Sequence, residues 1–224
     1  MIGAGGLGSE IGEGLIRKGV GTLMIFDDDR VELSNLNRQK FYRSDLSKNK
    51  AHRLAKNLAK EGFCGSTIHG HALTLQDAAL QGVALTCHIA IVGVDNNPAR
   101  IFASRFFGRQ GIPVIFTAVS QTGNNGYVFV QEPGGPCFGC LFPDSVNDET
   151  YPCPGIPAIK DILKIVAGIV LYAVDTLLMD RKRFWNYKDM FLDGSVPDNT
   201  WMIVREDICR LCGEKDDGNY TRLG

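Results

Sequence analysis

The sequence predicts an α/β domain whose β-sheet is parallel in its first half and mixed in its second. The glycine loop Gly3–Gly8 is followed by an amphipathic stretch and then by a short apolar run at 22–26, the order of a turn, a helix and a strand. A second apolar run at 88–94 ends in acidic and amide residues. Two further strand-like runs, 113–119 and 126–131, are joined by a link short enough for an antiparallel hairpin.

Bulk composition narrows the class of protein. A chain of 224 residues with 44% hydrophobic content can form one domain with a real core. Its 24 basic and 25 acidic residues give a net charge of −1, so no global field attracts nucleic acid or an acidic membrane. The seven cysteines include two Cys-x-x-Cys pairs, which fits a reducing compartment better than a disulfide framework. We therefore expect a cytoplasmic protein with neither a nucleic acid nor a membrane as partner.

The start of the chain is unusual for such a fold. A glycine loop of this kind follows a buried strand, and only Met1 and Ile2 precede it here. We expect one domain over residues 1–224 from which an N-terminal strand and helix are missing.

Spacing of apolar residues gives the elements of the first half. A period of four predicts a helix over Leu7–Lys18, and 22–26 is a strand of the buried type. Ser47 can cap a second helix that runs to about residue 60. Residues 66–73 are a weaker strand candidate.

The second half continues the alternation. Residues 95–98 supply a cap and a first-turn proline for a helix through Arg109. Residues 134–157 are rich in proline and glycine, as expected of a loop region built for a site. Residues 159–179 are long and apolar, but four charged residues interrupt them, so we expect a buried helix and not a membrane span. Residues 201–204 are a last strand candidate.

The glycine loop predicts a phosphate site. Gly3-x-Gly5-x-x-Gly8 lets backbone amides and a helix N-terminus approach phosphate, although a plain tight turn is the alternative. Asp27 follows the second strand, where an acid can accept hydrogen bonds from ribose hydroxyls. A nicotinamide-dependent oxidoreductase explains these features equally well.

A polar cluster after the second strand favours nucleotide triphosphate chemistry instead. Asn35, Asn37, Arg38 and Gln39 lie within five positions, and Lys50 follows shortly after. Arg38 and Lys50 together can neutralise a triphosphate and hold a pyrophosphate leaving group, which nicotinamide chemistry does not require. The alternative is a solvated polar turn with a lysine on a helix face.

Two metal sites are predicted. Asp95, at a strand end, is a candidate Mg²⁺ ligand beside the phosphates, with a helix-capping role as the alternative. Two Cys-x-x-Cys pairs predict a structural tetrahedral zinc site that clamps the loop after the sheet to the C-terminal end. Its ligands are Cys137, Cys140, Cys209 and Cys212.

In these motifs the chain resembles the ThiF/MoeB/HesA family and the adenylation domains of ubiquitin-activating enzymes. The matching pieces occur in the family's order over nearly the whole chain. They are Gly3-Ala-Gly-Gly-Leu-Gly8, Asp27-x-Asp29, Ser34-Asn-Leu-Asn-Arg-Gln39, Lys50, Val94-Asp95-Asn96 and the two cysteine pairs.

The resemblance implies an enzyme with a Rossmann-like ATP-binding fold and a zinc and crossover loop at 134–157. The C-terminal glycine carboxylate of a ubiquitin-like or sulfur-carrier protein would attack ATP, giving an acyl-adenylate and pyrophosphate. Asp27 would hold the ribose, Arg38 and Lys50 the phosphates, and Asp95 the Mg²⁺ and the α-phosphate. The implied ATP site comprises Gly3, Gly5, Gly6, Gly8, Asp27, Asp29, Asn35, Arg38, Gln39, Lys50, Asp95 and Asn96.

Cys153 lies in the proline-flanked segment 151–155. This place is similar to that of the catalytic cysteine in thioester-forming members of the family, and a thiolate there can accept the acyl group. Pro154 departs from the threonine that often follows that cysteine. A passive loop cysteine is the alternative.

The resemblance also bears on the expected oligomeric state and on the alternative functions. The resemblance implies a homodimer or a heterodimer in which an arginine from the partner's N-terminal segment completes the ATP site. We expect that segment to be missing from this chain. The alternative functions are a non-catalytic subunit of a heterodimeric activating enzyme, a nicotinamide-dependent oxidoreductase, and a branch that adenylates a carboxylate on tRNA. Non-catalytic subunits typically lose the pocket's Arg, Lys or Asp, and all three are present here.

Overall fold

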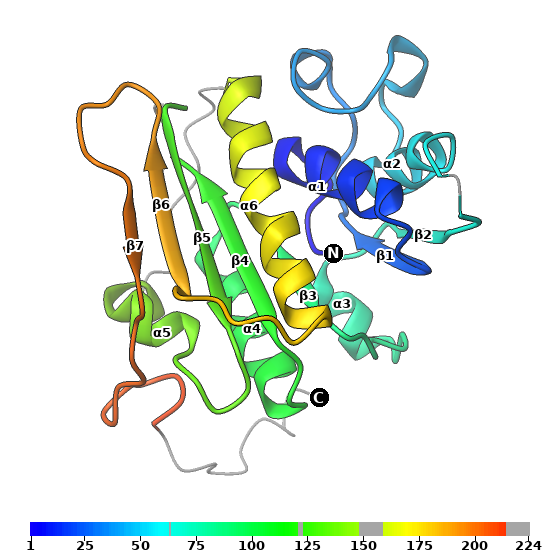
Figure 1. Ribbon diagram of the computed structural model, residues 1–224. Helices are drawn as coiled ribbons and strands as arrows, with labels where there is room; N and C mark the ends of the chain where they lie inside the picture. The colour runs from blue at the N-terminus through cyan, green and yellow to red at the C-terminus, as the bar shows by residue number, and fades with distance from the viewer. Residues whose placement is uncertain (63, 121–122, 148–158, 214–224) are drawn as a thin grey trace.

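The computed structural model describes residues 1–62, 64–120, 123–147 and 159–213. They form an α/β fold with a central sheet and helices on both faces (Figure 1). The helices are α1 (Gly6–Arg17), α2 (Lys50–Leu58), α3 (Leu75–Leu80), α4 (Asn97–Arg109), α5 (Phe138–Leu141) and α6 (Lys160–Leu178). The strands are β1 (Thr22–Phe26), β2 (Thr67–His71), β3 (Ala90–Val92), β4 (Val114–Val119), β5 (Asn125–Gln131), β6 (Tyr187–Phe191) and β7 (Asn199–Trp201).

The sheet is mixed, as the sequence predicts. β1 pairs with β2 in parallel, and β3 pairs with β4 in parallel. β4, β5, β6 and β7 then pair antiparallel in that order. The predicted hairpin is therefore present, and the change of direction falls at β4.

Ile2 joins the two halves of this sheet. It forms parallel bridges to Phe26 on one side and to Val92 on the other. Its N–H donates to the Ile91 carbonyl at 2.8 Å, and its carbonyl accepts from Gly93 N–H at 2.9 Å. Ile2 thus lies at the centre of the sheet and delivers the glycine loop to the edge where β1 and β3 end.

Two hydrophobic cores cover the two faces of the sheet. On one face α1, α2 and α6 pack over the strands, and Figure 1 shows α6 between β4–β5 and α1. The approach is close, because a Cβ on Gly126 would lie 2.7 Å from Val166 and one on Gly14 would lie 2.2 Å from Leu171. Aromatic residues of β4, β5, α4 and α5 fill the other core: Phe107, Phe116, Phe129 and Phe138.

The predicted helix at 159–179 is therefore a core helix. Its buried residues include Ile162, Val166 and Val170, and its first residue is Lys160. Across the described residues, no helix is both long enough and apolar enough to span a membrane. The prediction of a buried helix is confirmed.

Several element predictions need correction. Asn49, not Ser47, caps α2 by accepting the His52 N–H at 3.0 Å. Ser47 instead adopts a positive φ of 63° in the preceding turn. Two elements, α3 and β6, were not predicted from the sequence. β7 ends at Trp201, where a strand was predicted to begin.

The proline- and glycine-rich loop contains short helices in its described part. One turn of α-helix over 138–141 carries Cys140, and a 3₁₀-helix follows at Pro143–Asn147. Residues 148–157 of the predicted 134–157 loop, with Cys153, lie outside the described residues.

Candidate nucleotide-binding site

A cavity of about 860 Å³ lies where β1, Ile2, β3 and β4 end. Carboxyl ends of strands are where open α/β sheets bind ligands, and the volume lies within the range of small-molecule sites. The cavity brings together predicted residues that are up to 93 positions apart, from Gly3 to Asn96. Those that line it are Gly3, Gly5, Gly6, Asp27, Asp29, Asn35, Arg38, Gln39, Lys50, Asp95 and Asn96.

The glycine loop is compact because side chains cannot fit in it. Gly3 has a φ of 97°, and a Cβ there would lie 2.8 Å from the Gly93 carbonyl oxygen. A Cβ on Gly8 would lie 2.3 Å from the Gly3 carbonyl oxygen. Gly8 is the one predicted nucleotide-site residue that does not line the cavity; it permits the tight turn instead. Gly5 is the N-cap of α1, so the first amides of this helix open toward the cavity.

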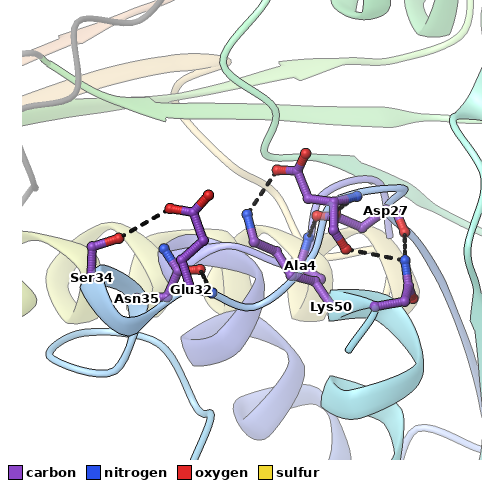
Figure 2. Close-up of polar contacts among 8 residues, drawn as sticks. Ala4, Asp27, Glu32, Ser34, Asn35 and Lys50 are labelled. Atoms are coloured by element: carbon purple, nitrogen blue, oxygen red, sulfur yellow. Dashed lines mark hydrogen bonds and ion pairs between the residues drawn. The ribbon is translucent and has the colours of Figure 1, made fainter. Parts of the chain in front are cut away.

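Asp27 is fixed by two backbone donors (Figure 2). Its Oδ2 accepts from Ala4 N–H at 2.6 Å, and its Oδ1 accepts from Asp29 N–H at 2.9 Å. Burial raises the pKa of Asp27, although the Ala4 N–H and the nearby Lys50 ammonium lower it. Each carboxylate oxygen can accept a second hydrogen bond, so capacity for a ribose remains.

Lys50 is anchored to the same strand end. Its N–H donates to the Asp29 carbonyl at 2.8 Å, and its Nζ lies 2.7 Å from Asp29 Oδ2. The Asn49 side chain strengthens this link, because its Nδ2 donates to the Asp27 carbonyl at 2.7 Å. Asn49 thereby connects the cap of α2 to the end of β1. This role was not predicted, although an Asn directly before a helix is a known capping signal.

The turn after β1 presents the amide and guanidinium groups. Asn35 is buried, and its Oδ1 accepts the Glu32 N–H at 2.9 Å, as Figure 2 shows. Arg38 donates from Nη1 to the Ser34 carbonyl at 2.9 Å. Gln39 is buried, and within the described residues its Oε1 has no hydrogen-bond partner. Because an unpaired buried amide oxygen is costly, Gln39 is suited to accept from a ligand.

A buried carboxylate stabilises this turn from behind. Asp45 is fully buried and accepts from Tyr42 N–H at 3.0 Å, from Arg53 Nε at 2.6 Å and from Asn57 Nδ2 at 2.8 Å. Burial raises the pKa of Asp45, but these donors outweigh it, so the net pKa is lowered. Asn57 Nδ2 also donates to the Lys40 carbonyl at 3.0 Å, which ties the turn to α2.

Asp95 and Asn96 follow the end of β3 and line the cavity on the side away from β1. Asn96 caps α4 by accepting the Ala99 N–H at 2.9 Å, so the helix-capping alternative for Asp95 is wrong. The Asp95 side chain is exposed and lines the cavity. In the described structure the carboxylates that cluster closely are Asp27, Asp28 and Asp29, and Asp95 is not among them.

Further cavity residues were missed by sequence reasoning. Arg100 follows Asp95 by five positions in the first turn of the predicted helix, and that position was a usable signal. Gln76 comes from α3, whose start is marked by Thr74 accepting the Asp77 N–H at 3.0 Å. The Thr-x-x-Asp pattern is a capping signal that predicts this helix.

The two cysteine pairs come together as predicted. The Sγ atoms of Cys137 and Cys140 are 3.7 Å apart, and the Cys137–Cys209 and Cys140–Cys212 pairs are each 3.5 Å apart. A tetrahedral zinc with Zn–S bonds of about 2.3 Å separates its sulfurs by about 3.8 Å. Burial raises the pKa of Cys137 and raises that of Cys212 to about 11. The pKa of Cys209 is lowered, because hydrogen bonds from the backbone N–H groups of Cys212 and Leu211 outweigh its burial. A cation would stabilise four neighbouring thiolates. The donor set therefore fits zinc.

A family model for the ThiF family matches residues 1–206. The chain belongs to the ThiF family. This confirms the resemblance drawn from the motifs, because the matched range contains the glycine loop, the turn after β1 and the Asp95 segment. It ends before the second cysteine pair at Cys209.

Named relatives of this ThiF family chain include adenylating enzymes. It is 27% identical to the SAMP-activating enzyme E1 of Haloferax volcanii, over 96% of this chain and 79% of the relative. It is 33% identical to the sulfur carrier protein ThiS adenylyltransferase of Bacillus subtilis, over 96% of this chain and 65% of the relative. The structure is similar to the crystal structure of E. coli MccB with ATP, with a TM-score of 0.77 and 20% identity over 95% of this chain and 65% of that one.

This ThiF family chain spans only part of the relatives that it matches. It spans less than two thirds of the B. subtilis enzyme and about half of the mouse ubiquitin-like modifier-activating enzyme 5. The likeness to MccB, at 20% identity, establishes the fold, namely an α/β fold with a mixed sheet.

Proposed function

We propose that this protein catalyses ATP-dependent adenylation of the C-terminal glycine of a ubiquitin-like or sulfur-carrier protein. The observation that carries the proposal is the single cavity in which the glycine loop, Asp27, Arg38, Lys50 and Asp95 converge. Family membership and relatives named as adenylyltransferases support it.

The chemistry requires positioning and charge neutralisation. A carboxylate oxygen of the carrier attacks the α-phosphorus of ATP, the bond from that phosphorus to the bridging oxygen breaks, and pyrophosphate leaves. No general base is needed, because the carboxylate is already the nucleophile. Arg38 and Lys50 stabilise the negative charge on the leaving group, and the amides of α1 with Gly5 and Gly6 bind phosphate oxygens.

Asp27 and the turn after β1 orient the nucleoside. The two backbone donors that hold Asp27 leave its carboxylate facing the cavity for the ribose hydroxyls. Asn35 shapes the turn, and Gln39 offers its unpaired Oε1. Asp29 sets the position of the Lys50 ammonium.

Two metals belong to the proposal. Asp95 would hold Mg²⁺ together with phosphate oxygens, and the ion would neutralise charge on the triphosphate. Cys137, Cys140, Cys209 and Cys212 would hold a structural zinc that links α5 to the segment at 206–212.

Cys153 and the quaternary structure extend the proposal. If the Cys153 thiolate attacks the acyl carbon of the adenylate, a thioester forms and AMP leaves. A passive cysteine is the competing assignment.

A second subunit, in a homodimer or a heterodimer, would supply the cation that completes the ATP site. The reduced thiols that this chemistry requires fit the cytoplasm.

The test is ATP–pyrophosphate exchange on the intact protein with candidate carriers that end in Gly-Gly. We expect exchange that depends on the carrier and is lost in Lys50→Ala and Asp95→Ala, with Lys56→Ala on the outer part of α2 as a matched control. Absence of exchange with every carrier, alongside bound ATP, would favour the non-catalytic subunit. If the protein bound NADH and not ATP, the alternative function as a nicotinamide-dependent oxidoreductase would be favoured.

A separate experiment addresses Cys153. A reducible carrier adduct is measured in the wild type and in Cys153→Ala, with Cys64→Ala as the control for an exposed thiol. Loss of the adduct only in Cys153→Ala supports the thioester. An undiminished adduct assigns Cys153 to the passive role.

A further inference from the structure

Arg100 reaches back across the turn that carries Asp95. It lies in the first turn of α4, and its Nη2 donates to the Val94 carbonyl at 2.7 Å. Its Nη1 donates to Asn97 Oδ1 at 3.0 Å. The two acceptors stand on either side of Asp95 in the sequence, so one guanidinium group closes the turn around that residue.

The planar guanidinium makes this a rigid link. Its donors project in a fixed fork, so two bonds to different residues fix both position and orientation. The Asp95 side chain, in contrast, accepts no hydrogen bond from the described part of the chain, and it faces the cavity. The position of its carboxylate therefore depends on the turn, and the turn is held by Asn96 as the helix cap and by Arg100.

Arg100 itself belongs to the cavity wall. It lines the same cavity as Asp95, and its Nε is buried with no hydrogen-bond partner among the described residues. Leaving one donor unpaired costs stability. Stability alone therefore does not explain an arginine at this position. The hydrogen bonds from Nη1 and Nη2 to Asn97 and Val94, which fix the turn, explain it better.

We infer that Arg100 is a positioning residue that holds Asp95 against the nucleotide phosphates and their metal. The inference rests on the proposed function, because it assigns Arg100 to the Asp95 side of the site. Arg38 and Lys50 are held by Ser34 and Asp29, residues outside this turn. Loss of the Arg100 link should therefore weaken the Mg²⁺-dependent part of ATP binding and spare the rest.

The test measures the ATP dissociation constant with Mg²⁺ and with EDTA, and it needs no turnover. The ratio of the constant in EDTA to the constant in Mg²⁺ reports how much the metal increases the affinity for ATP. We expect Arg100→Met and Asp95→Asn each to reduce that ratio by about 10-fold, the scale seen when a residue supporting a metal ligand is lost. Affinity in EDTA should change by less than about twofold. The control is Arg109→Lys at the other end of α4, which should leave both values unchanged.

Three further variants keep the inference falsifiable. Arg100→Lys retains the charge without the fork and should behave like Arg100→Met; recovery of the full ratio would show that charge alone matters and would overturn the inference. In Asp95→Asn, adding Arg100→Met should cause little further loss, whereas full additivity would show that the two residues act independently. Should Arg100→Met fail to fold, Asn97→Ala removes one of the two acceptors and should give a smaller loss of the same kind.

The outcomes separate this inference from the proposed function. A normal Mg²⁺ ratio in Arg100→Met, alongside working ATP–pyrophosphate exchange in the wild type, overturns only the role of Arg100. A wild type that binds Mg·ATP with the expected Arg100 dependence but exchanges no pyrophosphate supports the role of Arg100 and contradicts the proposed reaction. A wild type with no Mg²⁺-dependent gain contradicts the inference directly.

Discussion

A Cβ atom on Gly8 would lie 2.3 Å from the carbonyl oxygen of Gly3. No rotation of a side chain relieves this contact, because the obstacle is backbone. The turn between Ile2 in the sheet and α1 can therefore keep its shape only with glycine at position 8.

Gly8→Ala should consequently disturb both folding and nucleotide binding. Overpacking of this kind costs about 1–3 kcal/mol, and the shift of the loop displaces the amides that face the cavity. Urea unfolding and ATP titration are the measurements. Gly21→Ala is the control, because a Cβ there meets nothing within 4 Å. Unchanged ATP affinity in Gly8→Ala would contradict the assignment of this loop to phosphate binding.

Asp45 should give the protein part of its acid sensitivity. Its pKa is lowered in the folded state, because its three donors outweigh the effect of burial. Its stabilising contribution is therefore complete above the ordinary aspartate pKa of about 3.9 and is lost as pH falls through the lower folded value. Asp45→Asn should cost about 3 kcal/mol at neutral pH, because it leaves Arg53 and Asn57 facing an amide. It should also flatten the decline of stability below pH 4.

Urea unfolding at a series of pH values from 7 to 2.5 tests this. Asp28→Asn is a matched control, because Asp28 is exposed and its substitution should leave the curve nearly unchanged. If Asp45→Asn kept the wild-type slope below pH 4, another carboxylate would be responsible.

Ser47 offers a stabilising substitution. Its φ of 63° is one of two positive values among the described non-glycine residues, and its hydroxyl makes no hydrogen bond within the described structure. Backbone bonds fix this geometry, since Ser47 N–H donates to the Val31 carbonyl at 2.8 Å. Ser47→Gly removes the left-handed penalty and should stabilise the fold by about 1 kcal/mol.

Chemical denaturation should show a higher midpoint for Ser47→Gly. Ser44→Gly is the control, because Ser44 lies in a 3₁₀-helix with ordinary φ and should lose a little stability. Destabilisation by Ser47→Gly would mean that the turn relies on the serine side chain.

The four-cysteine cluster should carry one zinc per chain. Loss of a structural metal is among the larger single losses of stability. We expect Cys209→Ser to cost at least about 2 kcal/mol, which lowers Tm by roughly 4–8 °C for a domain of this size. Elemental analysis and thermal unfolding are the measurements, with Cys87→Ser as a control outside the cluster. A metal-free protein with unchanged Tm in Cys209→Ser would contradict the site.

Much of this molecule follows from local sequence signals. The glycine loop, the hairpin of β4 and β5 and the core helix α6 were predictable, because periodicity and turn residues act over a few positions. The cysteine cluster was predictable over a longer range, because each Cys-x-x-Cys pair supplies half of one tetrahedral site. β6, with the sequence Tyr-Lys-Asp-Met-Phe, lacks such a signal and becomes a strand by pairing with β5.

The sequence by itself determined which residue types form the pocket, because the motifs with glycine, acidic and basic residues can be recognised from their order and spacing alone. The tertiary structure decided how they are held. The connections from Asn49 to Asp27, from Asn57 to Asp45 and from Arg100 to Val94 depend on side-chain direction across turns and between elements. Such directions are set only when the sheet and helices pack, which is why the chain alone did not reveal them.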